Sequence, residues 1–203
     1  MKLPSFQRAW QVLRDEGVRS FWFKLLHLLG YHRLLLLDRP LTEPVPPAQA
    51  TSPLAMDWLS PADVAEYLAF RSSRDARLLD ERFERRHRCL LARADGRLVG
   101  VMWAATERAV IQSLRHELPL APGEVYLYDA YTDPAFRGRC IAPVLSVELL
   151  RRFRDEGCRR AIRGTVPENE AALRAHAKAG FERYAIIRRV KLGPWRFVWQ
   201  REF

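Results

Sequence analysis

A basic turn between a predicted strand and a predicted helix constrains this chain more than any other feature. Residues 124–131 are apolar and aromatic and predict a strand, and residues 144–153 have the apolar spacing of a helix. The turn between them, residues 132–143, is rich in arginine and glycine. Unpaired backbone N–H groups and the positive end of the helix dipole converge at such a helix start. The segment therefore predicts a cradle for phosphate groups at the end of a strand.

Composition limits the class of protein. The chain has 203 residues, and its hydrophobic content of 48% and charged content of 29% are those of a folded domain with an appendage. Its net charge of +10 favours an anionic partner, such as nucleic acid, an anionic membrane, an acidic carrier protein or a phosphorylated cofactor. The three cysteines are widely spaced, which predicts neither a disulfide framework nor a metal site. No signal peptide or long apolar run is evident, so we expect a cytoplasmic protein without a transmembrane helix.

Residues 1–39 are predicted to form an N-terminal amphipathic helical unit that ends in a short buried strand at 34–37. Two interpretations of this unit remain open. Its apolar face packs on the main domain, or its aromatic and basic residues make peripheral contact with an anionic membrane at the inner face. The proline-rich segment 40–55 predicts a linker, and the main domain should then occupy residues 56–203.

The main domain alternates between helical and strand patterns, which predicts an α/β (α+β) fold. Asp95-Gly96 between two strand-like runs predicts a hairpin, whereas residues 106–123 are expected to be irregular. The basic residues at 82–88 are interpreted as a solvated helix face, and nucleic acid is not expected as a partner. The other predicted elements are helices at 60–68, 75–86 and 170–178, and strands at 160–166, 181–192 and 195–199.

A second motif makes the phosphate cradle more specific. Residues 169–181 have the sequence Asn-Glu-Ala-Ala-Leu-Arg-Ala-His-Ala-Lys-Ala-Gly-Phe. This resembles the Asn-x-x-Ala-x-x-x-Tyr-x-Lys-x-Gly-Phe element of the GCN5-related N-acetyltransferase (GNAT) family. The turn at 137–142 resembles the acyl-CoA loop of the same family, in the same order and at the same spacing. The resemblance covers about residues 56–192. It implies a mixed, mostly antiparallel sheet flanked by helices, with acetyl-CoA as co-substrate and no metal.

The resemblance assigns residues to the co-substrate site. The turn would wrap the diphosphate of acyl-CoA, chiefly through the backbone N–H groups of Arg137, Gly138, Arg139, Cys140, Ile141 and Ala142. Cys140 stands where the family prefers glycine, and we expect it to fit if its φ is negative. Tyr131 and Thr132 would end a splayed strand whose backbone holds the pantetheine arm and the thioester carbonyl.

Asn169 and Ala172 of the second motif are also assigned to the co-substrate site. Asn169 either bonds near the splay or caps the following helix, and the two roles are compatible. His176 stands where the family has the tyrosine that protonates the departing CoA thiolate, so it is a candidate catalytic acid, with a structural role as the alternative. Asp129, ahead of Glu124, is the candidate base or substrate anchor, and an ion pair with an arginine is its alternative role.

We therefore expect an acyl-CoA-dependent N-acyltransferase, most simply an acetyltransferase, that transfers the acyl group directly to a primary amine in a ternary complex. A glycan or lipid amine would suit the basic, aromatic N-terminal unit. Two alternatives stay open: transfer from an acyl carrier protein, and a catalytically degenerate module that binds CoA and regulates. A homodimer is also left open.

Overall fold

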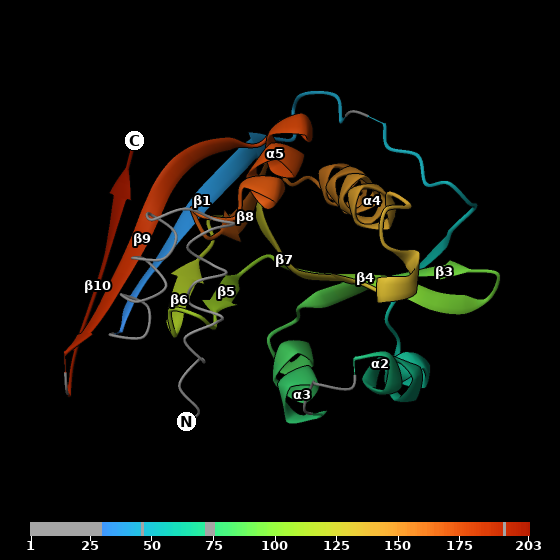
Figure 1. The fold of residues 1–203 in the computed structure, drawn as a ribbon, viewed down its shortest axis with the longest axis horizontal. Coiled ribbons are helices and arrows are strands. Elements are labelled where there is room, and N and C mark those ends of the chain that lie inside the picture. Colours follow the sequence, from blue (N-terminus) through green and yellow to red (C-terminus); the bar gives the residue numbers. More distant parts are fainter. Residues whose placement is uncertain (1–29, 46, 72–75, 193) are drawn as a thin grey trace, which may run out of the picture.

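A mixed eight-stranded sheet forms the centre of the protein (Figure 1). The computed structural model describes residues 30–45, 47–71, 76–192 and 194–203. The order of the strands is β10-β9-β1-β8-β7-β4-β3-β2, and β7 and β8 are the one parallel pair among the described strands. The strands of this sheet are β1 (Tyr31–Pro40), β2 (Ala55–Trp58), β3 (Arg88–Ala94), β4 (Arg97–Ala105), β7 (Glu124–Thr132), β8 (Arg160–Thr165), β9 (Glu182–Leu192) and β10 (Trp195–Glu202).

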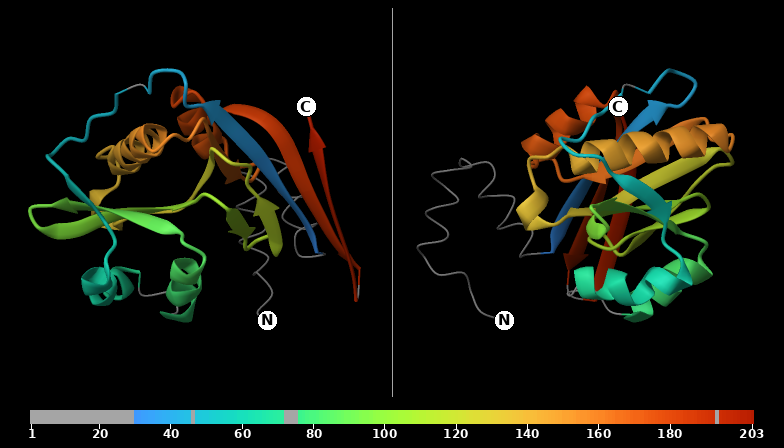
Figure 2. Two further views of the ribbon diagram at one scale, coloured as in Figure 1. Left: turned by 180° about the vertical axis from the view of Figure 1, so that it is seen from behind. Right: turned by 90° about the vertical axis from the view of Figure 1, so that its right-hand side faces the viewer.

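Helices cover both faces of the sheet (Figures 1 and 2). Helix α4 (Ile141–Asp155) and helix α5 (Glu170–Lys178) lie on one face, and helix α2 (Val64–Phe70) and helix α3 (Ala76–Glu84) lie on the other. Short 3-10 turns at Pro61–Asp63 and Pro134–Phe136 precede α2 and α4. The predicted mixed, mostly antiparallel sheet flanked by helices is therefore confirmed.

Strand β1 corrects the predicted domain boundary. It pairs with β8 on one side and with β9 on the other, so it belongs to the sheet rather than to a separate unit of residues 1–39. Leu34–Leu37 are all buried because an interior strand is covered on both faces, and alternate leucines enter the two cores. The predicted helices before this strand, and with them the predicted membrane contact, lie outside the described residues.

The proline-rich segment 40–55 is also more than a linker. Leu41 and Val45 are buried in the core beneath α4, and the Arg39 side chain donates to the carbonyl of Pro44 at 2.6 Å. Figure 2 shows this segment passing over the α4 side of the sheet before it enters β2. The main domain therefore includes β1, an interior strand of the sheet that precedes this segment.

The region predicted to be irregular, 106–123, contains a second, two-stranded sheet. Strands β5 (Arg108–Ile111) and β6 (His116–Pro119) form a hairpin that buries Ala109, Ile111 and Leu118 against β1, β8 and β9. Its alternation of apolar and polar residues spans four residues in each strand, which is too short to stand out in the sequence. Among the described residues, no helix is long and apolar enough to span a membrane.

Candidate functional site

Strands β7 and β8 separate halfway along their length. They pair from Glu124–Arg160 to Leu127–Arg163, whereas β7 continues to Thr132. On its other side β7 stays paired with β4 as far as Thr132. The backbone groups of residues 128–132 that face β8 therefore lack a strand partner, as expected for a splayed strand. Such groups are free to pair with the amides of an extended ligand.

A β-bulge interrupts β7 at the start of the splay. The register with β4 changes between the pairs Val101–Tyr131 and Trp103–Tyr128, which leaves one extra residue on β7. Asp129 lies in this bulge and has a positive φ of 49°. A bulge re-aims side chains, and here it turns Asp129 towards the helices α2 and α3.

The Asp129 carboxylate is held between two arginines. It accepts hydrogen bonds from Arg71 at 2.9 Å and from Arg82 at 2.8 Å, one on each oxygen. The side chains are only 12%, 6% and 7% exposed, respectively, so the three charges form a buried network. The ion pair given above as the alternative role of Asp129 is thus observed. Glu124, the second candidate base, is wrongly placed for that role, because it lies at the paired end of β7 and bonds to Arg160.

Aromatic rings surround the two arginines. The Arg71 guanidinium lies 4.3 Å from the centre of the Tyr131 ring, and Arg82 lies 4.6 Å from Trp103 and 5.1 Å from Tyr128. Such stacking stabilises a guanidinium when water is excluded. Tyr131 is half-buried, so this wall borders the splay on the side of α2 and α3.

Arg82 and His87 correct the interpretation of residues 82–88 as a solvated face, because both are buried. His87 donates from Nε2 to the carbonyl of Arg108 at 2.9 Å and accepts from the Tyr128 hydroxyl at 2.6 Å. Burial lowers the pKa of His87, which keeps the ring neutral in this bridge. In the sequence, the burial of Arg82 is indicated by its position three residues after the apolar Leu79, on the same face of a helix.

The basic turn between β7 and α4 lies where the phosphate cradle is predicted. Helix α4 begins at Ile141, and among the described residues the backbone N–H groups of 138–142 meet no acceptor. Arg137 and Arg139 are exposed and form no ion pair in the described structure. Several converging N–H donors, the helix dipole and two free cations together suit a diphosphate.

Gly100 sets the position of this cradle. A side chain at Gly100 would meet Ile141 Cγ2 at 2.7 Å and Leu145 Cδ1 at 3.1 Å, so the first turn of α4 lies directly on β4. Gly100 also pairs with Thr132, the last residue of β7. The glycine thereby brings the N–H cradle to the end of the splayed strand.

Cys140 does not meet the expectation of a negative φ. It adopts φ 59° and ψ 21°, the left-handed conformation, as the N-cap of α4. Gly138, two residues earlier, also has a positive φ, of 79°. The turn therefore needs two left-handed residues, and a residue with a Cβ occupies the second of them at a cost in stability.

The second motif forms α5, on the same face as α4. Asn169 Oδ1 accepts from the backbone N–H of Ala172 at 3.0 Å, so the predicted capping role is confirmed. The Asn169 amide nitrogen has no partner within the described structure and is free to donate to a ligand. Neither Asn169 nor Ala172 is buried.

Arg163 is a site residue that the sequence analysis did not identify. It is the last residue of β8 to pair with β7, and it is only 8% exposed. Its guanidinium donates to Ser146 Oγ at 2.8 Å and lies 3.3 Å from His176 Nδ1. Its Nε is buried without an acceptor, and it pairs with no carboxylate among the described residues. A cation this poorly compensated is costly unless an anionic group comes to it.

Arg163 changes the chemistry of His176. Burial, and then the charge of Arg163, lower the pKa of His176 to about 4. The ring is therefore neutral at neutral pH. Because the guanidinium can only donate, Nδ1 accepts from it and Nε2 carries the ring proton. His176 thus offers an N–H donor, and the predicted protonated acid is not available.

Comparison with known proteins agrees with this geometry. The model of the acetyltransferase (GNAT) family matches residues 54–181. A GCN5-related N-acetyltransferase from Sphaerobacter thermophilus is 17% identical, with a TM-score of 0.58, over 90% of this chain and 56% of that one. The structure of AAC(6')-Iy with the bisubstrate analogue CoA-S-monomethyl-acetylneamine is 23% identical, with a TM-score of 0.52, over 64% of this chain and 92% of that one. No curated protein matches the chain in sequence.

The first prediction concerns the left-handed N-cap. We expect Cys140→Gly to be about 1 kcal/mol more stable than Cys140→Ala, because only glycine adopts this conformation without strain from a Cβ. Urea unfolding of both variants measures the difference. Equal unfolding free energies would show that the turn relaxes to accept a side chain.

The second prediction concerns the ion-pair network at the bulge. Asp129→Ala leaves two buried arginines without their carboxylate and should lower the free energy of unfolding by roughly 3–5 kcal/mol. Glu117→Ala is the control, because it removes an exposed carboxylate from Arg85 and should cost at most about 1 kcal/mol. If Asp129→Ala is as stable as the control, Asp129 does not hold the bulge together.

Proposed function

The chain belongs to the GNAT family of acetyltransferases, and we propose that it transfers an acyl group, most simply acetyl, from CoA to a primary amine. One observation carries the proposal: the N–H cradle of residues 138–142 meets the end of the splayed strand β7. A ligand with a diphosphate at one end and amides along an extended arm fits this arrangement, and acyl-CoA is such a ligand.

The donor would be held mainly by backbone groups. The N–H groups of 138–142 would bind the diphosphate, and the charges of Arg137 and Arg139 would add to the attraction. The pantetheine arm would enter between β7 and β8 and pair with the free backbone of residues 128–132. An N–H from this segment would also stabilise the oxyanion that forms when the amine attacks. The Asn169 amide nitrogen would donate near the same arm.

The leaving group would meet Arg163 and His176. During transfer a C–N bond forms, the C–S bond breaks, and the sulfur leaves as a thiolate. Arg163 supplies a buried positive charge on this side of the splay, and His176 supplies an N–H donor. Both would stabilise the thiolate, and the proton that the amine nitrogen loses would reach the sulfur through solvent. His176 thus would assist as a neutral donor in place of the family's tyrosine.

Asp129 would act as a positioning residue in this scheme. Both of its carboxylate oxygens accept from arginines, so it fixes Arg71 and Arg82 at the border of the splay. The acceptor would approach from the side of α2 and α3, opposite α4 and α5. The neighbour solved with an acetylneamine conjugate supports amino sugars as the first acceptors to try.

Release of free thiol from acetyl-CoA tests the proposed function. The full chain is incubated with a panel of amino sugars, lipid amines, polyamines and peptides, and we expect amine-dependent release from at least one class. Faster transfer from acyl carrier protein than from CoA would change the donor. Tight CoA binding without turnover on any amine would favour the regulatory module instead.

The third prediction separates the effect of the His176 N–H donor from the effect of the Arg163 charge on the pKa of His176. We expect His176→Phe to lower kcat by about 10-fold or more, because it removes the N–H donor, with the Kd for CoA changed less than about threefold. His176→Gln keeps an amide donor and should retain more activity. In Arg163→Gln the pKa of His176 should rise from about 4 towards the ordinary range of histidine, which NMR titration measures.

The expected pH dependence of activity follows from the charge on the His176 ring. In the parent protein His176 stays neutral down to about pH 4, so activity that depends on neutral His176 persists through pH 5–6. In Arg163→Gln the ring takes up a proton at a higher pH than in the parent, although burial, the larger cause, still holds its pKa below the ordinary range. An unchanged kcat in His176→Phe would remove His176 from the mechanism, and an unchanged pKa in Arg163→Gln would show that burial alone lowers it.

A further inference from the structure

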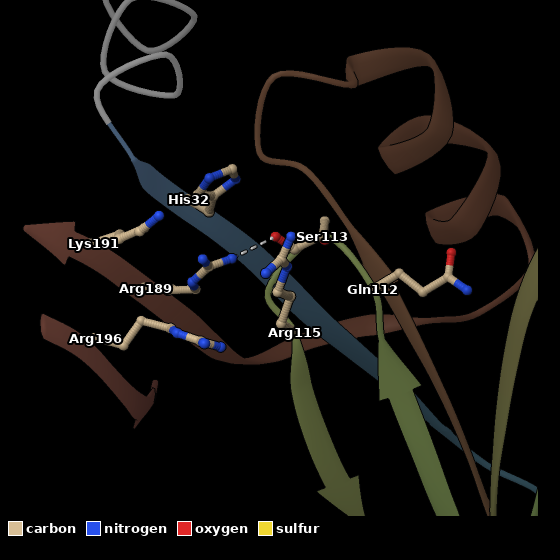
Figure 3. A pocket seen from close by; sticks show the side chains of 7 residues that line it. All are labelled: His32, Gln112, Ser113, Arg115, Arg189, Lys191 and Arg196. Carbon is tan, nitrogen blue, oxygen red and sulfur yellow. Dashed lines mark hydrogen bonds between the residues drawn. The ribbon is translucent and has the colours of Figure 1, made fainter. Parts of the chain in front are cut away.

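A basic pocket lies away from the site described above (Figure 3). Its volume is about 240 Å³, and it is formed by strands β1, β9 and β10 and by the turn between β5 and β6. Strand β8 separates β1 from β7, so the pocket and the N–H cradle lie on different parts of the sheet. Its lining includes His32, Ser113, Arg115, Arg189, Lys191 and Arg196.

The cations of the pocket have no acidic partners in the described structure. Arg115, Arg189, Lys191 and Arg196 form no ion pair with any described carboxylate, unlike Arg33 and Arg160 of the same sheet. In Figure 3 the three arginines and Lys191 surround one space, with His32 at its edge. Positive charges gathered in this way repel one another, and the arrangement is stabilised when an anion neutralises them.

Arg189 is the central group of the pocket. Its side chain comes from β9, is only 6% exposed and is held by one long hydrogen bond from Nη1 to the carbonyl of Ser113, at 3.4 Å. Its Nε is buried and has no acceptor. Burial, and then the positive charges of Arg196 and Arg115, lower its pKa. A buried guanidinium with donors to spare is suited to a bidentate oxyanion.

The position of the pocket relates it to the open end of the splay. Leu35 pairs with Thr165, the last residue of β8, and β1 begins four residues earlier, at Tyr31. His32 and its partner in register, Arg189, therefore lie beyond the end of β8, towards which the gap between β7 and β8 widens. A ligand in the pocket would sit at the same end of the sheet as the reacting groups of the splay.

We propose that this pocket binds a phosphate ester, at a site separate from the cradle for the donor diphosphate. Three guanidiniums and an ammonium supply more donors than a single carboxylate can use, whereas a phosphate group offers three strong acceptor oxygens. The volume accommodates a phosphate together with the first atoms of the group that carries it. The proposal does not depend on the acetyl transfer, because it rests on the charges of the pocket alone.

Calorimetric titration of the full chain tests the proposal. CoA is kept in excess so that the cradle is filled, and inorganic phosphate and glycerol 3-phosphate are the probes, at low ionic strength. We expect both to bind, and Arg189→Gln to weaken their Kd by about 10-fold or more, as for the loss of a charged hydrogen-bond donor. Because Arg189 is buried and its loss can affect folding, the double variant Arg115→Gln/Arg196→Gln provides a second measurement at exposed positions.

The matched control is Arg151→Gln, which removes the same charge from an exposed position on α4 and should leave the Kd unchanged. Sedimentation with phosphatidylcholine vesicles, with and without phosphatidate, distinguishes the two sources of the phosphate. Binding of glycerol 3-phosphate in solution supports a soluble ester, and binding confined to phosphatidate vesicles supports a lipid headgroup. The proposal is wrong if no probe binds, if the pocket variants bind as the parent does, or if Arg151→Gln weakens binding equally.

Discussion

The contact between α4 and β4 at Gly100 is the constraint on which the site depends. Any side chain there would push the first turn of α4 away from the sheet, because Ile141 and Leu145 already occupy the space. With the helix start held against β4, its unpaired N–H groups face the end of β7, where β8 has already turned away. An anion cradle and an open strand edge are common features on their own. Their juxtaposition makes a site for one extended, phosphorylated ligand.

The buried arginines on the two sides of the splay differ in whether a carboxylate neutralises their charge. On the side of α2 and α3, Arg71 and Arg82 share the carboxylate of Asp129 and lie on aromatic rings, which fixes their positions. On the side of α4 and α5, the partners of Arg163 are uncharged: Ser146, the Met102 sulfur, the Phe181 ring and a neutral His176. An arginine that is paired with a carboxylate has a fixed position and little net field. An arginine without a carboxylate keeps a positive electrostatic field that acts on a ligand. Arg71 and Arg82 thus form a fixed border on one face of the sheet, and Arg163 supplies a positive field on the other face.

Local signals in the sequence predicted the positions of the two motifs, whereas the short β5–β6 hairpin and the long-range contacts were missed. The turn at 137–142 and the motif at 169–181 lie where their patterns predicted, since each is one strand end or helix start. By contrast, the proline-rich segment led to the prediction that β1 lies outside the main domain, although its four leucines fit an interior strand. Arg163 and Asp129 depend on partners far along the chain, and the left-handed φ of Cys140 follows from the geometry of the turn. No periodicity in the sequence carries such information.

The net charge of +10 is partly explained by the positions of the arginines in the structure. Many arginines are neutralised within the structure, for example by Asp38, Glu124 and Asp129. Among the described arginines without a carboxylate partner, some lie at three places, the cradle, Arg163 and the pocket around Arg189, whereas others, such as Arg151, Arg159 and Arg183, lie singly at exposed positions. Solubility requires no such clustering, since evenly spread charges would serve it as well. Each cluster combines a positive field with hydrogen-bond donors that lack acceptors, which points to anionic groups on the ligands. Part of the excess charge is therefore placed where an anionic ligand would bind, and the rest is spread over the surface.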